Sequence, residues 1–148
     1  MTKTYSIHEV AELFDLPIST IRYYDKKGLL PFVAKNEAGN REFTRADLGF
    51  IKTICCLKNT GMPIKNIRQY IQYCMQGPTS MAERHALLEH HRQQVLNEQA
   101  KIAANLVEID RKIAKYSDPS STELIANQLR IAGQEKVSLG LDNPFNNF

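Results

Sequence analysis

The stretch between Pro78 and Pro119 contains neither glycine nor proline, and no other feature limits so strongly what this chain can fold into. An uninterrupted helix of about 37 residues would be roughly 55 Å long, because each residue adds about 1.5 Å. Its apolar residues recur at alternating steps of three and four and form one stripe. The stripe includes Leu88, Val95, Ile102, Leu106, Ile109 and Ile113. Neither the helix itself nor a small preceding domain can cover a stripe of that length, so residues 79–116 are predicted to dimerise as a coiled coil.

Two short helices near the start of the chain are predicted from their capping signals. Ser6 and Glu9 have the spacing of a capping box, in which each side chain binds the backbone amide of the other residue. An apolar stripe that includes Leu13 follows, and Pro17 is tolerated in the first turn of the next helix. Two helices joined by so short a turn indicate a helix-turn-helix, in which the second helix contacts DNA.

The second predicted helix, residues 17–24, and the segment after it are rich in side chains that suit nucleic acid. Arginine, tyrosine and lysine donate to phosphate oxygens, and a helix fits the major groove of DNA. Gly28 is expected to end this helix. The candidate DNA-binding residues of this part of the chain are Tyr5, Thr20, Arg22, Tyr23, Tyr24 and Lys26. The alternative is a surface helix whose two tyrosines are half-buried in the core.

A small hairpin is predicted directly after this helix, within residues 31–44. Val33 and Phe43 suit strands, and residues 36–40 supply the turn between them. Such a hairpin is the wing of a winged helix domain. Arg41, just past the turn, is placed to enter a minor groove or to hold a phosphate. The alternative is an exposed loop arginine without a role in binding.

Two further helices complete the predicted N-terminal domain. Thr44 is the expected N-cap of a third helix, which Gly61 ends, and Pro63 opens a fourth. The fold class is therefore mainly α-helical, with a winged helix-turn-helix domain over residues 1–76.

The C-terminal half begins with the long helix. Ser80 and Glu83 have the spacing of a second capping box at its start. In the last segment, residues 117–148, we expect a short helix over residues 121–132 followed by a mobile tail.

Charge and composition narrow the class of protein. The net charge is only +3, but residues 1–68 carry eleven Lys and Arg against seven acidic residues, so the positive charge lies in the N-terminal half. No apolar run approaches the roughly 18 residues of a membrane span, and we expect no signal peptide. Three cysteines, two of them adjacent, do not suggest a secreted disulfide framework. We expect a cytoplasmic protein with reduced thiols and no membrane contact.

The residue pattern predicts no enzyme. The chain lacks a plausible set of nucleophile, base and orienting group, and it lacks a Gly-rich phosphate loop. His85, His90 and His91 are close in sequence, but histidines at this spacing on a helix rarely converge on one metal. We expect solvated or interfacial histidines, with no catalytic residues, no cofactor and no metal site.

In order and spacing, roughly residues 4–116 resemble the MerR family of bacterial transcription regulators. The resemblance is carried by Tyr5-Ser6-Ile7-His8-Glu9-Val10-Ala11, Thr20-Ile21-Arg22-Tyr23-Tyr24-Asp25, Gly28-Leu29-Leu30-Pro31, Asn40-Arg41-Glu42-Phe43, Leu57-Lys58-Asn59-Thr60-Gly61-Met62 and the long helix. It implies a homodimer with winged domains at the ends of an antiparallel coiled coil. It also implies that the dimer binds a pseudo-palindrome in an over-long promoter spacer and distorts this double-stranded DNA, so that RNA polymerase engages both promoter elements.

The same resemblance assigns roles to single residues. It implies that Arg22, Tyr23 and Tyr24 hold the DNA backbone and base edges, that Arg41 is the wing contact, and that Lys65 reaches a phosphate. Distorting DNA costs roughly 1–6 kcal/mol, which calls for firm phosphate contacts on both sides of the bend.

A short-tailed subgroup of the family, associated with aldehyde and electrophile stress, resembles this chain around Cys56. On a helix, Cys55 falls on the apolar face, while Cys56 is turned about 100° away. Lys52, one turn earlier, would favour the thiolate, which is the nucleophilic form. Cys56 is therefore the candidate redox or electrophile sensor and Cys55 the buried small residue. The alternative is that both cysteines are unreactive.

Two other functions remain open at this point. One is a regulator controlled by a small ligand or a partner protein through residues 117–148. The other is an architectural DNA-binding protein, such as an excisionase. Short winged helix proteins of that kind lack a long dimer helix, so residues 80–116 argue against it.

Overall fold

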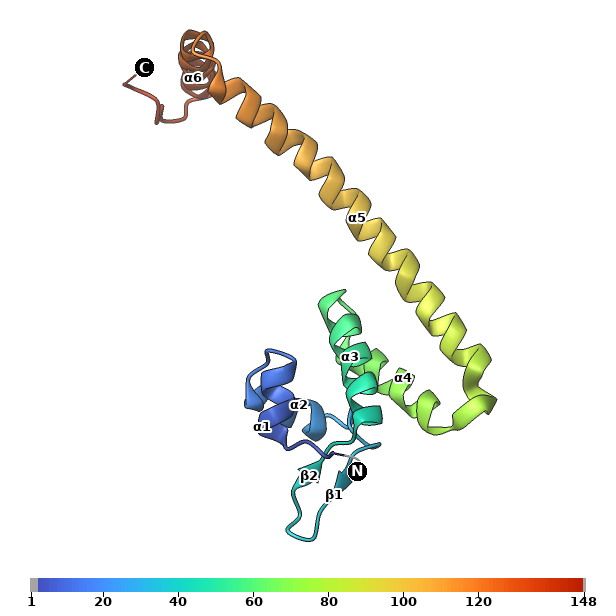
Figure 1. The fold of residues 1–148 in the computed structure, drawn as a ribbon. Coiled ribbons are helices and arrows are strands. Elements are labelled where there is room, and N and C mark those ends of the chain that lie inside the picture. Colours follow the sequence, from blue (N-terminus) through green and yellow to red (C-terminus); the bar gives the residue numbers. More distant parts are fainter. Residues whose placement is uncertain (1–2, 148) are drawn as a thin grey trace. The chain divides into compact units, whose positions relative to one another are not determined.

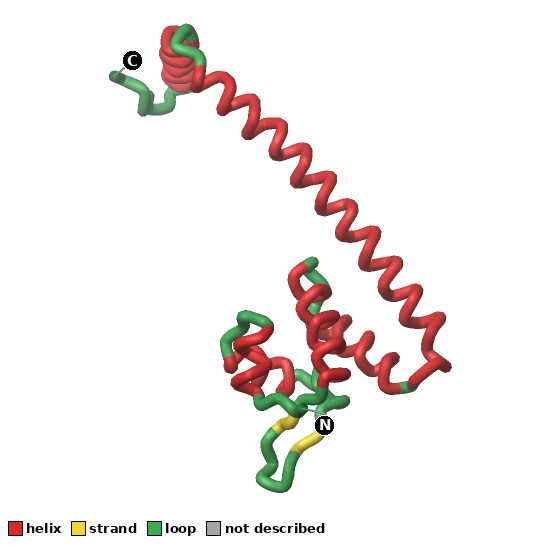
Figure 2. Tube along the Cα trace, viewed as in Figure 1, coloured by secondary structure: helices red, strands yellow, loops and turns green. Residues whose placement is uncertain are grey.

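The structure of the protein is a computed structural model that describes residues 3–147 (Figure 1). The elements are α1 (Ile7–Leu13), α2 (Ile18–Lys26), β1 (Ala34–Lys35), β2 (Arg41–Glu42), α3 (Arg45–Asn59), α4 (Ile64–Met75), the 3₁₀ helix η1 (Gly77–Ser80), α5 (Met81–Ser117) and α6 (Ser121–Ser138). The chain forms two compact units, one up to Asn97 and the other from Glu98. The expectation of a mainly α-helical fold with a helix-turn-helix, a hairpin and a long helix is confirmed, as Figure 2 shows.

The first helix begins where its capping signals predict. The Ser6 hydroxyl accepts from the Glu9 amide at 3.2 Å, and the Glu9 carboxylate accepts from the Ser6 amide at 3.2 Å. The bond from the Ser6 amide, followed by Lys3, lowers the pKa of Glu9. Leu13 was expected on the apolar face, and this is wrong because its side chain is exposed while Val10 is buried.

Helix α2 begins one residue later than predicted, with Pro17 as the N-cap, and it continues to Lys26. Gly28 ends this region in the left-handed conformation, with φ of +76°, which glycine adopts without strain. The Arg68 Nε of α4 donates to the Lys27 carbonyl at 2.6 Å. The end of α2, which as the second helix of the helix-turn-helix is called the recognition helix below, is therefore tied to α4.

The predicted hairpin forms a two-stranded antiparallel sheet, in which Ala34 pairs with Glu42 and Lys35 with Arg41. The predicted strand residue Phe43 lies just beyond the sheet, where it forms an isolated bridge with Tyr5. Two backbone hydrogen bonds join it to Tyr5, with 2.7 and 2.9 Å between nitrogen and oxygen. Phe43 is fully buried, so the wing is anchored to the chain that enters α1.

The hydrophobic core lies among α1 to α4 and the base of the wing. Thr44 caps α3 and forms a full capping box with Asp47, as predicted. The large side chains of the hydrophobic core that are almost completely buried are those of Ile21, Leu29, Leu30, Phe43, Ile51, Ile54, Ile67 and Ile71. These side chains fix the recognition helix and the wing on one support.

The predicted capping box at Ser80 is not formed. Ser80 belongs to η1 and is buried, and its hydroxyl donates toward the carbonyls of Tyr73 and Gly77 instead of accepting from the amide of Glu83. Arg84 Nε in turn donates to the Ser80 oxygen at 3.0 Å. Ser80 therefore links the two helices, because it donates to a carbonyl of α4 and accepts from Arg84 of α5. The local sequence pattern did not predict this link.

The long helix runs from Met81 to Ser117 without a break, close to the predicted range. Its first turns pack on the N-terminal domain, because Leu87 contacts the core and His91 is buried. Of the two expected environments, solvated or interfacial, His91 therefore has the interfacial one, because it is buried where α5 contacts the end of α3. The predicted domain boundaries at residues 76 and 79 stay a prediction.

The C-terminal segment is more ordered than predicted. Helix α6 extends to Ser138 rather than to residue 132. Gly133 lies inside it, and a Cβ added there would lie 2.5 Å from the Asn143 side chain. The expectation of a mobile tail is wrong for residues 133–138, and Asn143 lies against α6.

Among the helices of residues 3–147, none combines the length and the apolar character that crossing a membrane requires.

Candidate nucleic-acid interface

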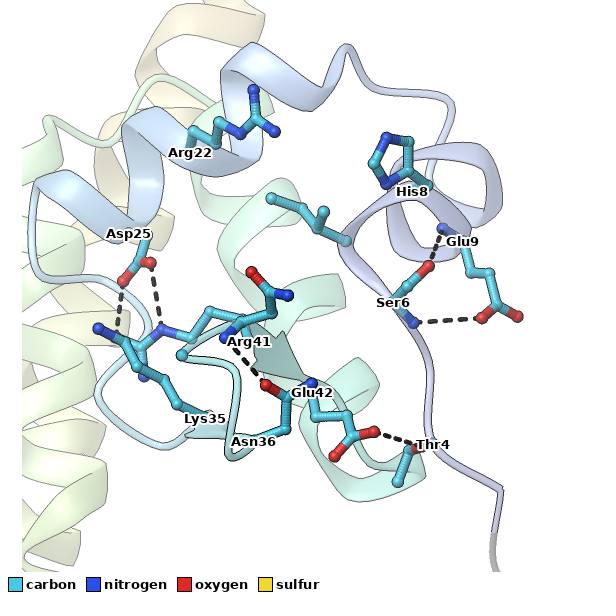
Figure 3. A pocket seen from close by; sticks show the side chains of 13 residues that line it. Thr4, Ser6, His8, Glu9, Arg22, Asp25, Lys35, Asn36, Arg41 and Glu42 are labelled. Carbon is cyan, nitrogen blue, oxygen red and sulfur yellow. Dashed lines mark hydrogen bonds and ion pairs between the residues drawn. The ribbon is translucent and has the colours of Figure 1, made fainter.

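A hollow of about 520 Å³ lies between α1, α2 and the wing. Figure 3 shows Arg22 and His8 on one border and Lys35 and Asn36 on the opposite border. Its lining residues are Thr4, Ser6, Ile7, His8, Glu9, Arg22, Asp25, Lys35, Asn36, Gly39, Asn40, Arg41 and Glu42. Donor groups from three separate elements therefore converge on one surface. His8 and Lys35 carry no sequence signal of this, because only the fold brings them to Arg22.

The recognition helix exposes a small group of donors. Arg22 and Lys26 are exposed, and the Tyr23 side chain is 43% exposed. The Lys27 ammonium lies 5.7 Å from the centre of the Tyr23 ring, within range of a cation–π contact. A phenol hydroxyl held beside a cation suits a phosphate oxygen.

The prediction that Tyr24 contacts DNA is wrong. Tyr24 is only 4% exposed and belongs to the core. Burial raises the pKa of its hydroxyl, with smaller contributions from Cys55 and Tyr23. The two adjacent tyrosines therefore differ in role because successive residues of a helix point about 100° apart. The alternative of a core tyrosine was right for Tyr24.

Arg41 is engaged within the domain, and its predicted role as a direct wing contact stays a prediction. Its Nη2 and Nε lie 2.8 and 3.1 Å from the two carboxylate oxygens of Asp25, and its Nη1 donates to the Val33 carbonyl. The Arg41 and Asp25 side chains are 23% and 33% exposed. Arg41 therefore clamps the wing to the recognition helix (Figure 3), and three of its five N–H groups are used in doing so. The sequence did not signal Asp25 as its partner, since the two residues are 16 positions apart.

The turn of the wing is polar and is closed by a side-chain hydrogen bond. The Asn40 amide donates to the side-chain oxygen of Asn36 at 3.0 Å, and Gly39 has φ of +82°. Lys35 and Asn36 stay exposed on this tip. The wing therefore offers an ammonium and an amide where the sequence had predicted an arginine.

The other candidate residues are not among those that line the hollow. Tyr5 is half-buried and has the Lys3 ammonium 4.9 Å from its ring centre, and Thr20 is half-buried on α2. Lys65 is exposed in the first turn of α4. The hollow thus brings together Arg22 and Arg41, but not the remaining predicted DNA contacts.

The cysteines of α3 differ in environment. Cys56 is exposed, whereas Cys55 is half-buried and next to the core. Burial, followed by the nearby Cys56, raises the pKa of the Cys55 thiol. No group of three or more metal-binding side chains gathers anywhere in the part of the chain that the structure describes.

Comparison with known proteins agrees with this geometry. Residues 5–74 match the family model of the MerR HTH family regulatory protein. An HTH-type transcriptional regulator of Haemophilus influenzae is 37% identical over 113 residues, which are 76% of this chain and 84% of that protein.

Two solved structures extend the likeness beyond the DNA-binding domain. HiNmlR, a MerR family regulator lacking the sensor domain and bound to promoter DNA, matches with a TM-score of 0.74 and 35% identity, over 82% of this chain and 96% of that one. A MerR family regulator from Bacillus thuringiensis matches with a TM-score of 0.72 and 44% identity, over 77% of this chain and 100% of that one. The chain therefore belongs to the MerR family of DNA-binding transcription regulators.

Proposed function

We propose that this regulator acts as a homodimer that binds a pseudo-palindromic site within a promoter spacer and distorts the DNA there. The observation that carries this proposal is the hollow between α1, α2 and the wing, where Arg22, His8 and Lys35 converge. It is supported by the similar regulator HiNmlR, which was solved bound to promoter DNA.

The exposed hydrogen-bond donors contact different parts of the DNA. Helix α2 enters the major groove, where Arg22 reaches base edges or a phosphate and Tyr23 and Lys26 hold the backbone. Lys35 on the wing and Lys65 on α4 contact phosphates on either side, and Tyr5 and Thr20 border the recognition helix. Arg41 acts indirectly, because its pair with Asp25 keeps the wing at a fixed distance from α2.

The homodimer is proposed from the apolar stripe of α5. Ile102, Leu106, Ile109 and Ile113 are all exposed large hydrophobic residues. A continuous apolar face of this kind is stable in water when another apolar surface covers it. A second copy of the same stripe, running antiparallel, would place one winged helix-turn-helix domain at each end of the coiled coil. RNA polymerase would then meet the distorted promoter spacer that the two domains hold.

The direct test is to incubate the purified protein with fragmented DNA of its source organism and to sequence the fragments that it retains. We expect inverted half-sites inside elongated promoter spacers, and transcription from such a promoter in vitro should change when the protein is added. Retention without sequence preference, or sites unrelated to promoters, would show an architectural protein instead.

We further propose that Cys56 receives an electrophile or redox signal. Cys56 is exposed, whereas burial raises the pKa of the neighbouring Cys55 thiol, and both observations support Cys56 rather than Cys55 as the accessible thiol. A Cys56 thiolate would add to the carbonyl carbon of an aldehyde, and the resulting alkoxide would take up a proton from water. The added group would lie on the last turns of α3.

Replacing Cys56 by serine is expected to keep promoter binding and to abolish the transcriptional response to an aldehyde or an oxidant. Mass spectrometry of the parent protein should find Cys56 modified before Cys55 and Cys74. Cys55→Ser is the matched control, and it should keep the response. A full response of the Cys56→Ser strain would move the signal to residues 117–148, where a small ligand or a partner protein would have to act.

A further inference from the structure

The last turn of α3 is hydrogen-bonded to the long helix. The Thr60 hydroxyl oxygen lies 2.8 Å from Nε2 of His91, and these residues are 31 positions apart. His91 is only 8% exposed, so this contact is largely shielded from water. A buried imidazole nitrogen without a partner would be costly, because its lost hydrogen bond to water would not be replaced.

Counting protons gives the direction of this bond. The Thr60 hydroxyl has a single proton, and the carbonyls of Cys56 and Leu57 accept from it at 2.8 and 3.2 Å. The hydroxyl oxygen is then left as an acceptor toward His91. Nε2 of His91 therefore carries the proton and donates it to Thr60.

This bond lies beside the exposed thiol of α3. The Cys56 carbonyl accepts both from the Thr60 hydroxyl at 2.8 Å and from the Thr60 amide at 3.1 Å. The chain of bonds from the Cys56 backbone through Thr60 to His91 therefore joins the turn that carries Cys56 to α5.

A second contact makes the first turns of α5 a fixed part of the DNA-binding unit. Arg84 donates to the Gly77 carbonyl at 2.6 Å and to the Ser80 hydroxyl at 3.0 Å, which holds the junction with α4. Leu87, between Arg84 and His91 on the same helix face, packs against the core. His91 is the last of these three attachments along α5, and it contacts Thr60 at the end of α3.

We infer that Thr60 and His91 are positioning residues of this regulator: their hydrogen bond holds the first turns of α5 at the end of α3 that carries Cys56. A change in this turn of α3 alters how α5 is held, and thereby the geometry that the bound DNA receives, with little effect on affinity. The part that concerns regulation rests on the proposed function, whereas the attachment of α5 does not.

The experiment uses the full chain and two pairs of variants. Thr60→Val removes the hydroxyl at nearly constant shape, and Thr60→Ser keeps it. His91→Leu removes the donor, while His91→Gln places an amide N–H near the position of Nε2. His90→Gln, at the exposed neighbouring histidine, is the matched control.

The first readout is amide hydrogen exchange in residues 85–95, which does not require any promoter. Exchange should be at least about fivefold faster in Thr60→Val and His91→Leu than in Thr60→Ser, His91→Gln and His90→Gln, because local opening is easier without the bond. Equal exchange in all five variants would overturn the inference. If Thr60→Val fails to fold, the His91 pair gives the same comparison.

The second readout is transcription in vitro from the selected promoter, measured beside DNA affinity. Thr60→Val and His91→Leu should change promoter output by about fivefold or more while affinity changes less than about twofold, and Thr60→Ser and His91→Gln should restore the parent output. A parallel loss of affinity and output would show a merely structural role and contradict the inference. A parent protein that does not affect transcription would instead refute the proposed function, and the exchange result would still decide the attachment.

Discussion

Replacing Ile109 by aspartate is expected to separate the proposed dimer into monomers. The Ile109 side chain is 54% exposed in the single chain, so the substitution should leave the fold of the monomer intact. In the paired coiled coil the new carboxylate would be buried without a partner in each copy. Such burial costs several kcal/mol per ion, and the remaining apolar pairs of the stripe are not expected to offset this cost.

The affinity for the specific DNA site should fall when the dimer dissociates, because one winged helix-turn-helix domain supplies only half of the contacts to a pseudo-palindrome. Analytical ultracentrifugation measures the assembly, and a band-shift titration measures the affinity. Ala104→Asp, which places the same charge on the opposite face of α5, is the matched control and should remain dimeric. An intact dimer of the Ile109→Asp protein would show that the apolar stripe is not the interface in the proposed register.

Local signals were sufficient to predict most of the helices. The capping boxes at Ser6 and Thr44 act over three residues, so their pattern is complete in the sequence itself. The limits of α5 follow from the Pro78 and Pro119 breaks, since proline cannot donate within a helix. The period of the apolar residues then sets the face that each helix buries.

What the sequence did not predict depends on contacts between distant residues. Ser80 fits a capping pattern, but its hydroxyl donates to the carbonyls of Tyr73 in α4 and Gly77 in η1 instead. Arg41 is a residue type that often contacts DNA, yet in the fold it forms an ion pair with Asp25. His91 is buried by the packing of α5 on α3, which no local pattern encodes. In each of these cases a polar side chain found its partner within the fold.

The difference between Arg22 and Arg41 gives the second large prediction. Both residues were predicted to bind DNA, but Arg22 is exposed, whereas Arg41 is partly buried and donates to Asp25 and Val33. Arg22→Ala should weaken DNA binding by about 1–3 kcal/mol, the usual worth of a charge-assisted or bidentate contact. Its free energy of unfolding should change by less than about 0.5 kcal/mol, as for most surface substitutions.

Arg41→Ala should reverse the balance, because it removes the clamp and leaves the Asp25 carboxylate half-buried without its partner. We expect the free energy of unfolding to fall by about 1–2 kcal/mol, a value reduced for the partial exposure of the pair. Urea unfolding and band-shift titrations over a range of salt concentrations separate the two effects. If Arg22 holds a phosphate, its loss should also reduce the slope of log affinity against log salt by about one.

An Arg22→Ala protein that folds normally and binds the promoter with unchanged affinity would remove Arg22 from the interface. A fully stable Arg41→Ala protein would show that the ion pair with Asp25 does not hold the wing.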